Sequence, residues 1–376
     1  MTEVGEKSIL ASSGSRLESL DAIRGFDMLW IMGLTAVVRG FLQLFPNGKE
    51  TWLFHQMCHV EWHGLAFYDT IFPLFLFIAG ISFPFSCAKQ RERGVPAAAI
   101  HWRIVKRAVM LVLLGLVVNG ALMFDQGNVR FASVLGKIGL AWMMAAFVYL
   151  HAGLRARLAT IAVLLAGYWA VLRFCVNPLA PAGADPMSLE GNFMGYLDGF
   201  LTPGYLWEKN IFDPSGVPMS VVAVGTALLG MCAGDIVRVE RWKPVRRVGI
   251  LFVTGLVLLT AGWLVSCSVP FNKKLWTPSY TLFVGGYSFA LFAALYWIID
   301  VRGWRSWSFP LKVIGVNAIA IYMAQAIVRF NDVSRVFLGG VASWFPSPDF
   351  VIALGRLALA WGFLYFLYRK NTFLKV

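Results

Sequence analysis

Charged residues are scarce in this sequence of 376 residues. Asp, Glu, Lys and Arg together make up 14% of it, whereas soluble domains carry about 25%. Hydrophobic residues account for 58%, and the mean hydropathy is +0.67. A soluble protein of this length needs a charged surface that this composition cannot supply. The composition therefore excludes a soluble enzyme, a disordered chain and a nucleic-acid-binding domain, and it indicates an integral membrane protein.

Common cofactor and metal motifs are also absent from the sequence. The five cysteines include no Cys-x-x-Cys pair and form no even-numbered framework. The sequence contains neither the phosphate-binding Gly-x-x-x-x-Gly-Lys nor the dinucleotide-binding Gly-x-Gly-x-x-Gly. No Asn-x-Ser/Thr glycosylation site occurs, which favours a bacterial inner membrane over a secretory-pathway membrane. No signal peptide is evident, and residues 1–27 are predicted to form a cytoplasmic or interfacial segment.

Long apolar runs fill most of the chain. A membrane-spanning helix needs about 20 mostly apolar residues, and backbone groups in lipid must be hydrogen-bonded within helices or closed barrels. The length of the runs and their lack of alternation predict an all-α polytopic bundle of ten helices in one transmembrane domain, residues 28–376. The shorter run Val333–Phe345 leaves an eleventh span, a re-entrant segment or an interfacial segment open. The ten runs are Met28–Phe45, Thr70–Ala88, Ala108–Phe124, Val134–Leu150, Leu158–Val176, Val217–Ile236, Val248–Cys267, Ser279–Ile299, Leu311–Val328 and Phe350–Tyr368.

The net charge of +13 has a topological explanation. With ten spans and a cytoplasmic N-terminus, 22 of the 33 Lys and Arg residues fall in cytoplasmic segments and 9 fall outside. This is the bias that cytoplasmic loops carry in membrane proteins. Both termini are therefore predicted to be cytoplasmic.

A histidine-rich run follows the first predicted span. His55, His59 and His63 are spaced four residues apart, which would place them on one face of a helix. Three interpretations are open: solvated interfacial histidines, a zinc site made by two of them with Glu61 or Asp69, and proton transfer at the outer membrane face. One ion cannot reach all three along a helix, which limits a zinc site to two of them with a carboxylate; the prediction we make is no metal site.

Other polar groups inside or beside the predicted spans are functional candidates as well. The residues Arg39, Asp69, Lys137 and Arg356 are ionisable residues at membrane depth, where charges are costly.

The predicted outer loop around Asn272, Lys273 and Trp276 combines amide, ammonium and aromatic groups that suit contact with a sugar, although it can also simply anchor two helices. Asn317 lies in the ninth predicted span, where packing is the leading interpretation.

Several short motifs are spread from residue 16 to about residue 330. They are Ser19–Gly25, His59 with Trp62, Gly64, Leu65, Asp69, Phe72, Pro73 and Phe77–Gly80, Arg130–Leu135 with Lys137–Gly139, Asn272–Thr277 and Gly315–Ile319. Together they resemble one family, the transmembrane heparan-alpha-glucosaminide N-acetyltransferases and their bacterial relatives.

The resemblance implies transfer of an acetyl group from cytosolic acetyl-CoA to an amino-sugar or glycan acceptor at the far side of the membrane. It places the active-site histidine on His59. Two positions depart from the family pattern, because Thr35 stands where the family has a catalytic-site Asn and His63 replaces the Asn of its Trp-Asn-Gly motif. The resemblance leaves a homodimer open.

The site residues expected from the motifs and the chemistry fall into three groups. For catalysis we expect His59 as general base or transient acetyl carrier, Asp69 or Glu61 as its orienting carboxylate, and Thr35 or the Asn272 amide as the oxyanion donor. Substrate binding is assigned to Glu61, Trp62, His63, Asn272, Lys273, Trp276 and Asn317. Cofactor binding is assigned to Arg39, Arg103, Arg107 and Lys137.

Two other functions stay open at this point. A secondary transporter for sugars or their derivatives suits ten spans, although a pair of helices broken at the midplane is not evident. An acyltransferase that modifies a hydroxyl group of a surface glycan cannot be told from an N-acyltransferase by sequence.

Overall fold

The computed structural model describes residues 17–121 and 129–374, and these form an all-α bundle without β-strands beyond isolated bridges. Within these two described ranges, eight helices are long and apolar enough to cross a membrane, or nine if one bent pair counts as a single span. The predicted class, a polytopic helical membrane protein, is confirmed. The predicted number of ten spans and the cytoplasmic placement of the termini stay predictions, as does the division at residue 27.

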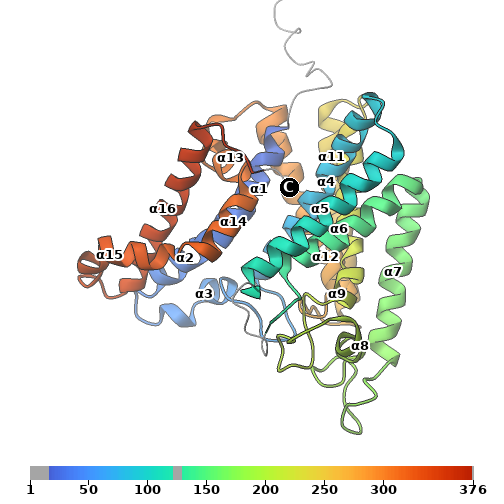
Figure 1. Ribbon diagram of the computed structural model, residues 1–376, viewed down its shortest axis with the longest axis horizontal. Helices are drawn as coiled ribbons and strands as arrows, with labels where there is room; N and C mark the ends of the chain where they lie inside the picture. Colours follow the sequence, from blue (N-terminus) through green and yellow to red (C-terminus); the bar gives the residue numbers. More distant parts are fainter. Residues whose placement is uncertain (1–16, 122–128, 375–376) are drawn as a thin grey trace, which may run out of the picture.

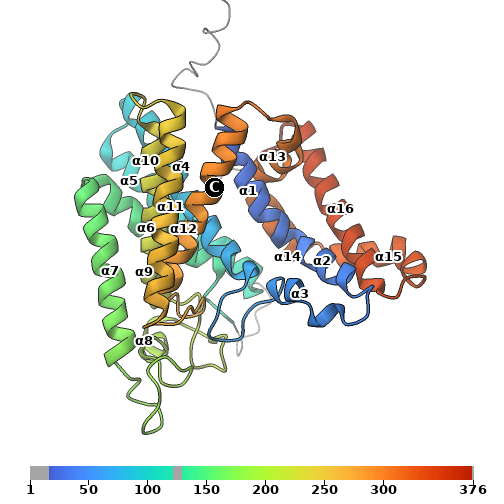
Figure 2. The same cartoon turned by 180° about the vertical axis from the view of Figure 1, so that it is seen from behind.

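The helices group into two bundles that lie side by side (Figures 1 and 2). Helix α1 packs against α13 in the smaller bundle and also against α4 and α12 in the larger one. It therefore lies at the junction between the two. The larger bundle contains α4 (Ile71–Glu92), α5 (Ala97–Val118), α6 (Val134–His151), α7 (Leu154–Phe174), α9 (Val217–Val222), α10 (Val224–Arg238), α11 (Pro244–Ser266) and α12 (Pro278–Leu295). The smaller bundle contains α1 (Glu18–Leu29), α2 (Thr35–Leu42), α13 (Phe309–Gly315), α14 (Ala318–Ile327), α15 (Phe330–Ala342) and α16 (Pro348–Arg369).

The first span begins earlier than the sequence pattern predicts. Helix α1 starts at Glu18 and continues through a π-helical turn, Trp30–Leu34, into α2, so that the span covers Glu18–Leu42 instead of Met28–Phe45. Gly33 takes a φ of +132° in this turn, a backbone conformation that side chains disfavour. The polar residues of the first three turns concealed the start of the helix. The first sixteen residues lie outside the described part.

Two other predicted spans and the shorter thirteen-residue run have a structure that differs from a single straight apolar helix. The run Leu311–Val328 is a helix pair, Ser306–Gly315 and Ala318–Ile327, bent by 57°. The run Ala108–Phe124 overlaps α5, whose first half carries Arg103, Lys106 and Arg107 and is therefore less apolar; residues 122–124 lie outside the described part. The run Val333–Phe345 overlaps α15, an amphipathic helix of 13 residues, which is short for a span.

The ends of the bundle can be told apart by their residues. Short helices α3 (Trp52–Gln56) and α8 (Phe193–Leu201) and the longest loops gather at one end, which carries His59 and is called the histidine end below (Figure 1). Away from this end, at the break of the bent helix pair, Asn317 donates its amide hydrogen to the Thr372 carbonyl oxygen at 3.1 Å. A Cβ on Gly315 would meet the Asp21 carbonyl oxygen near the start of α1. The start of α1 lies opposite the histidine end, whereas the C-terminus is at mid-height between the two bundles (Figures 1 and 2).

Small residues bring helices of the larger bundle into direct backbone contact. Gly80 of α4 faces Gly230 of α10, and a Cβ atom on Gly230 would clash with the Phe77 carbonyl oxygen. Because backbone atoms cannot move aside without shifting a whole helix, this contact requires glycine. The buried core of the larger bundle forms around this crossing, with Phe77, Leu228 and Met231 fully or almost fully shielded.

The Gly230→Ala substitution is expected to destabilise the protein by about 1–3 kcal/mol, because it overpacks the α4–α10 crossing. Gly249→Ala in α11 is the matched control, since a Cβ there meets nothing within 4 Å, and it should be neutral or stabilising by up to about 1 kcal/mol. Thermal unfolding of the two detergent-purified variants measures the difference. Equal melting temperatures would contradict the close-packing argument.

Candidate active site

The segment that contains the three histidines is a loop over most of its length. Helix α3 ends at Gln56, residues 57–66 have no regular helical structure, and Gly64 takes a φ of +125°. His55, His59 and His63 therefore do not share a helix face, and this expectation was wrong. The cause is the Asp69 carboxylate, whose Oδ2 accepts hydrogen bonds from the backbone N–H groups of Val60 at 3.3 Å and Ala66 at 3.2 Å.

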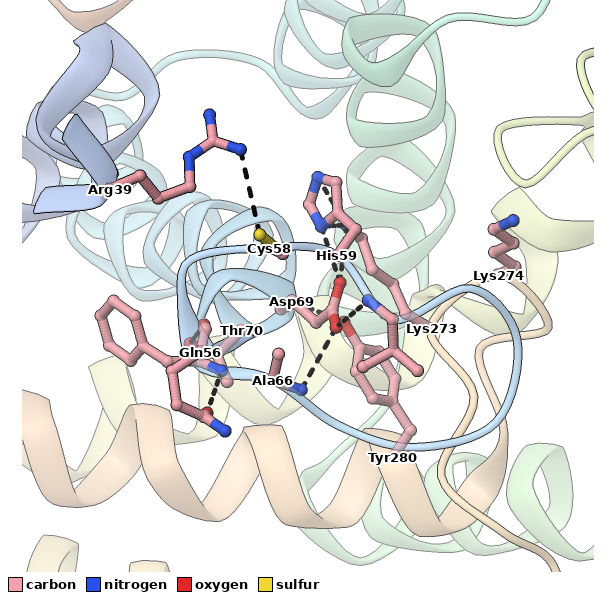
Figure 3. A network of polar contacts seen from close by, with 12 residues as sticks. Arg39, Gln56, Cys58, His59, Ala66, Asp69, Thr70, Lys273, Lys274 and Tyr280 are labelled. Carbon is pink, nitrogen blue, oxygen red and sulfur yellow. Dashed lines mark hydrogen bonds and ion pairs between the residues drawn. The ribbon is translucent and has the colours of Figure 1, made fainter. Parts of the chain in front are cut away.

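Asp69 also collects two side chains, as Figure 3 shows. Its Oδ1 lies 2.8 Å from His59 Nδ1 and 3.2 Å from Lys273 Nζ. Lys273 Nζ in turn lies 3.0 Å from His59 Nδ1 and 3.5 Å from its Nε2. The three residues thus form one compact cluster, the His59–Asp69–Lys273 triad, although Lys273 is more than 200 positions away in the sequence.

The triad joins a buried carboxylate to an accessible imidazole. Asp69 is 1% exposed, whereas the His59 side chain is 51% exposed. Because an ionised carboxylate only accepts hydrogen bonds, the contact with Asp69 requires hydrogen on His59 Nδ1. This tautomer leaves a lone pair on Nε2, as a general base requires. The Tyr68 ring stacks on the imidazole, with centroids 4.4 Å apart, and limits its rotation.

Lys273 reaches the triad from the loop between α11 and α12. Burial lowers the pKa of the Lys273 ammonium from its ordinary value, while the charge of Asp69 acts in the opposite direction. The loop is held by Asn272, which is fully buried and whose Oδ1 accepts from the Leu275 N–H at 2.8 Å. Trp276 takes a positive φ of 52° there, so the backbone turns tightly just before α12.

Some predicted substrate-binding residues lie beside the triad. Trp62 donates its indole hydrogen to the Met187 carbonyl oxygen at 2.7 Å, and the Asn272 amide nitrogen lies 3.5 Å from His63 Nδ1. Partial burial lowers the pKa of His63, with Asp185 acting in the opposite direction. Glu61 is exposed and, within the described part of the chain, has no hydrogen bond or ion pair with His59. Of the two carboxylates considered for orienting His59, it is Asp69 that contacts it.

Trp276 and Lys137 are close to one another but buried. Lys137 is 1% exposed, its ammonium donates to the Pro214 carbonyl oxygen at 2.9 Å, and it lies 3.8 Å from the centre of the Trp276 ring. The Trp276 indole in turn donates to Thr226 Oγ1 at 3.2 Å. These contacts support the loop that carries Lys273.

The predicted cofactor-binding residues divide between the two ends of the bundle. Arg39 of α2 points toward the Cys58 sulfur at 3.9 Å, next to His59 (Figure 3), and Lys137 is at the same end. Arg103 and Arg107 lie in the first half of α5, beyond the 22-residue helix α4, about 33 Å long. Arg103 is exposed and donates to Gln90 Oε1 at 2.7 Å, whereas the Arg107 guanidinium lies 4.4 Å from the centre of the Trp142 ring.

Two further predicted residues are not brought to the triad. Asn317 is tied to the C-terminal segment away from the histidine end, as described above. Thr35 is 4% exposed at the start of α2, and its hydroxyl faces the Trp30 carbonyl oxygen at 3.5 Å. Within residues 17–121 and 129–374, no three His, Cys, Asp or Glu side chains converge as metal ligands.

A buried ionic network that sequence reasoning missed supports the same end of the bundle. Arg130 forms a bidentate ion pair with Asp213, with both N–O distances at 2.7 Å. Asp198 Oδ2 accepts from the Asp213 backbone N–H at 2.9 Å, and its Oδ1 accepts from the Thr202 hydroxyl at 2.6 Å. Arg130 opens one of the family-like motifs, but nothing in the sequence indicates which acid it meets.

Tyr68 and Tyr280 were also missed. The Tyr280 hydroxyl donates to the backbone oxygen of Asp69 at 2.7 Å and is fully buried. Tyr68 precedes Asp69 directly, so its closeness to the triad could have been noticed, whereas its stacking on His59 depends on the loop conformation. Tyr280 is the third residue of α12 and gave no such signal.

Comparison with known proteins finds similarity to one family of membrane enzymes. The family profile described as heparan-alpha-glucosaminide N-acetyltransferase, catalytic, matches residues 16–190, which include His59 and Asp69. The human heparan-alpha-glucosaminide N-acetyltransferase is 25% identical over 374 aligned residues, and the mouse protein is 26% identical; each alignment covers 85% of this chain and 54% of the relative. The chain is therefore similar to members of this family, and it spans about half the length of the curated relatives it matches.

Asp198 gives the histidine end a pH-dependent contribution to stability. Burial, together with the nearby negative charge of Asp213, raises the pKa of Asp198 from 3.8 to about 6, although its hydrogen bonds with Thr202 and Asp213 act in the opposite direction. The folded state therefore binds the Asp198 proton more tightly than the unfolded state does, and this proton binding stabilises the fold. The stabilisation is complete below pH 3.8, the unfolded-state pKa, and is lost as the pH rises through about 6, the folded-state pKa.

We expect the wild type to lose stability relative to Asp198→Asn, by up to about 3 kcal/mol, as the pH rises from about 4 to about 7. The measurement is thermal unfolding of both proteins at several pH values, with their difference plotted against pH. A difference that does not depend on pH would refute the assignment to Asp198.

Proposed function

We propose that this protein transfers an acetyl group from acetyl-CoA to the amino group of an amino-sugar or glycan acceptor at the extracytoplasmic face of a bacterial inner membrane. The observation that carries the proposal is the 2.8 Å contact between His59 and Asp69, which leaves the Nε2 atom available at an exposed position. The family relationship and the apolar helices support the reaction class and the membrane setting.

The triad provides the groups that amide formation from a thioester requires. His59 Nε2 takes a proton from the acceptor amine as the amine nitrogen attacks the thioester carbonyl carbon. The carbon–sulfur bond then breaks, and the same imidazole returns the proton to the departing thiolate. Asp69 holds the imidazole orientation and stabilises the cation formed in between. The products are the acetylated amine and free CoA, so atoms and charge balance.

The developing oxyanion needs a hydrogen-bond donor. Lys273 is the donor we favour, because its ammonium lies within 3.0–3.5 Å of both imidazole nitrogens and is still 24% exposed. The Asn272 amide is buried and Thr35 faces a backbone oxygen, so each needs a rearrangement to take this role. Trp62 and His63 flank the triad and are proposed to contact the acceptor.

The region between the middle of α5 and the end of the bundle opposite the triad fits the charged end of the acyl donor. Arg107 Nε is buried and has no hydrogen-bond partner in the described part of the chain, and the Arg107 and Arg24 guanidinium groups are close enough to repel each other. A phosphate group would relieve both conditions. We therefore propose that Arg107, with Arg103 nearby at the surface, holds the nucleotide end on the cytosolic side.

A secondary transporter is the second candidate, favoured by one observation. The helix pair Ser306–Gly315 and Ala318–Ile327 is broken and bent by 57°, a feature of many transporters. Exchange of labelled sugar across proteoliposomes without any CoA compound would support transport and contradict the acyltransferase proposal. A hydroxyl acceptor would use the same triad, and product analysis separates it from an amine.

The His59→Ala substitution is expected to reduce acetyl transfer at least about 10²-fold, because it removes the general base. The assay uses purified protein with radiolabelled acetyl-CoA and glucosamine, and His55→Ala on the exposed helix α3 serves as the control. Transfer at the wild-type rate by a folded His59→Ala protein would overturn the proposed function.

A second pair of variants distinguishes the two carboxylates. Asp69→Asn should lower kcat at least about 10²-fold, because the amide no longer fixes the Nδ1–H tautomer, whereas Glu61→Gln should stay within about threefold of the wild type. The ratio of kcat to KM effects is the second readout, since loss of an orienting carboxylate should lower kcat with little change in KM. If Glu61→Gln has the larger effect, the orienting role belongs to Glu61.

A further inference from the structure

Helix α1 presents one polar face to the middle of the molecule. Arg24, Asp27 and Trp30 are spaced three residues apart, so their side chains lie along the same side of the helix. Arg24 donates to the hydroxyl of Ser82 on α4, across the junction between the two bundles. The face is therefore turned toward the larger bundle and away from lipid.

Asp27 is an unusual residue on this face. It is fully buried, and neither of its carboxylate oxygens has a hydrogen-bond partner within residues 17–121 and 129–374. Trp30 Nε1, one turn further along, is likewise buried without a partner in the described chain. A buried polar atom without a partner costs about 1–3 kcal/mol, so two such groups on one face need a reason.

Trp30 lies next to the turn that carries Asp69, and Asp27 lies one turn before Trp30 on α1. The Trp30 ring packs edge-on against Phe67, with centroids 4.8 Å apart, and Tyr287 of α12 lies near both Thr70 and Asp27. Phe67 and Thr70 are the first and last residues of the 3-10 turn that contains Asp69. Asp27 and Trp30 thus lie between the triad and the Arg24–Arg107 region.

The buried polar atoms of Asp27 and Trp30 that have no partner indicate which hydrogen-bonding groups a ligand needs. The Asp27 carboxyl group accepts a hydrogen bond through its carbonyl oxygen and the Trp30 N–H donates one, so a matching ligand offers an N–H donor beside a carbonyl acceptor. Secondary amides have this combination. A phosphate dianion has acceptors only and would leave the Asp27 carbonyl oxygen without a donor.

We propose that Asp27 and Trp30 bind the amide groups of the pantetheine arm of the acyl donor, between its nucleotide end near Arg107 and its thioester near His59. The inference rests on the proposed function and adds to it the site that positions the arm. Along α1, Arg24 and Trp30 are about 9 Å apart, so an extended arm passes Asp27 on its way from the Arg24–Arg107 region to the triad. Asp27 and Trp30 are positioning residues, since neither contacts the reacting atoms.

The test measures binding with three probes: CoA, S-acetylpantetheine and adenosine 3′,5′-bisphosphate. Asp27→Leu, which removes the acceptor oxygen, should weaken the binding of CoA and S-acetylpantetheine about tenfold and leave the bisphosphate unchanged. Trp30→Phe should act in the same direction with a smaller change. Arg107→Gln should show the reverse pattern, with weaker binding of CoA and the bisphosphate only. Equilibrium dialysis of detergent-purified protein gives the dissociation constants.

Trp361→Phe is the matched control for Trp30→Phe, because the Trp361 indole already donates to the Pro310 carbonyl oxygen, away from the junction. Thermal unfolding shows which variants are folded. If folded Asp27→Leu and Trp30→Phe proteins bind CoA as tightly as the wild type, the inference is overturned and the proposed function stands. If the wild type binds none of the three probes, both are overturned.

Discussion

The buried carboxylate of Asp69 is the group on which the architecture of the histidine end depends. One oxygen accepts two backbone N–H groups and so shapes the loop from Val60 to Ala66, while the other holds His59 and Lys273. The Tyr280 hydroxyl fixes the backbone of the same residue. A single side chain therefore determines the loop conformation and the arrangement of the proposed catalytic groups. Its hydrogen-bond partners offset the free-energy cost of burying a carboxylate.

The position of α1 explains how two bundles can serve one site. Gly25 and Gly315 allow α1 and α13 to touch through their backbones, which leaves the opposite face of α1 turned toward the larger bundle. The π-helical turn at Trp30–Leu34 then redirects the chain, so that Trp30 meets Phe67 at the base of the triad. Because α1 packs against α13 on one side, its opposite side, with Arg24, Asp27 and Trp30, faces the junction between the bundles.

The fold class and the centre of the site could be predicted from sequence for clear physical reasons. Apolar runs of about 20 residues have few alternatives to membrane helices, and the approximate positions of most of them agree with the structure. His59, Asp69 and Lys273 each lie in a motif that resembles the family, so they could be selected without knowing that they touch. Their contact, at 2.8–3.2 Å, depends on loops that no periodicity describes.

The errors have physical causes as well. A spacing of four residues predicts a common helix face only if the helix exists, and the backbone bonds to Asp69 replace helix in the histidine segment. Asp27 was overlooked because the first span was predicted to begin at Met28, one residue later. With the helix beginning at Glu18, Asp27 becomes an ionisable residue at membrane depth, the class that most often marks a functional site.

The division of charge along the bundle follows from the chemistry that we propose. A nucleotide with several phosphates cannot enter a purely apolar interior, so we propose that it binds from exposed Arg103, at the end of the bundle opposite the triad, inward to Arg107. The reacting carbonyl must nevertheless reach His59, beyond the length of α4. Only a long, uncharged arm with amide groups can connect the two, and an interior that receives it needs a few polar atoms left without protein partners. Asp27 and Trp30 have such atoms along that path. The apolar interior that a membrane protein needs accounts for the low charge content of the sequence. The proposed path of the arm through that interior accounts for the buried polar atoms that have no protein partner.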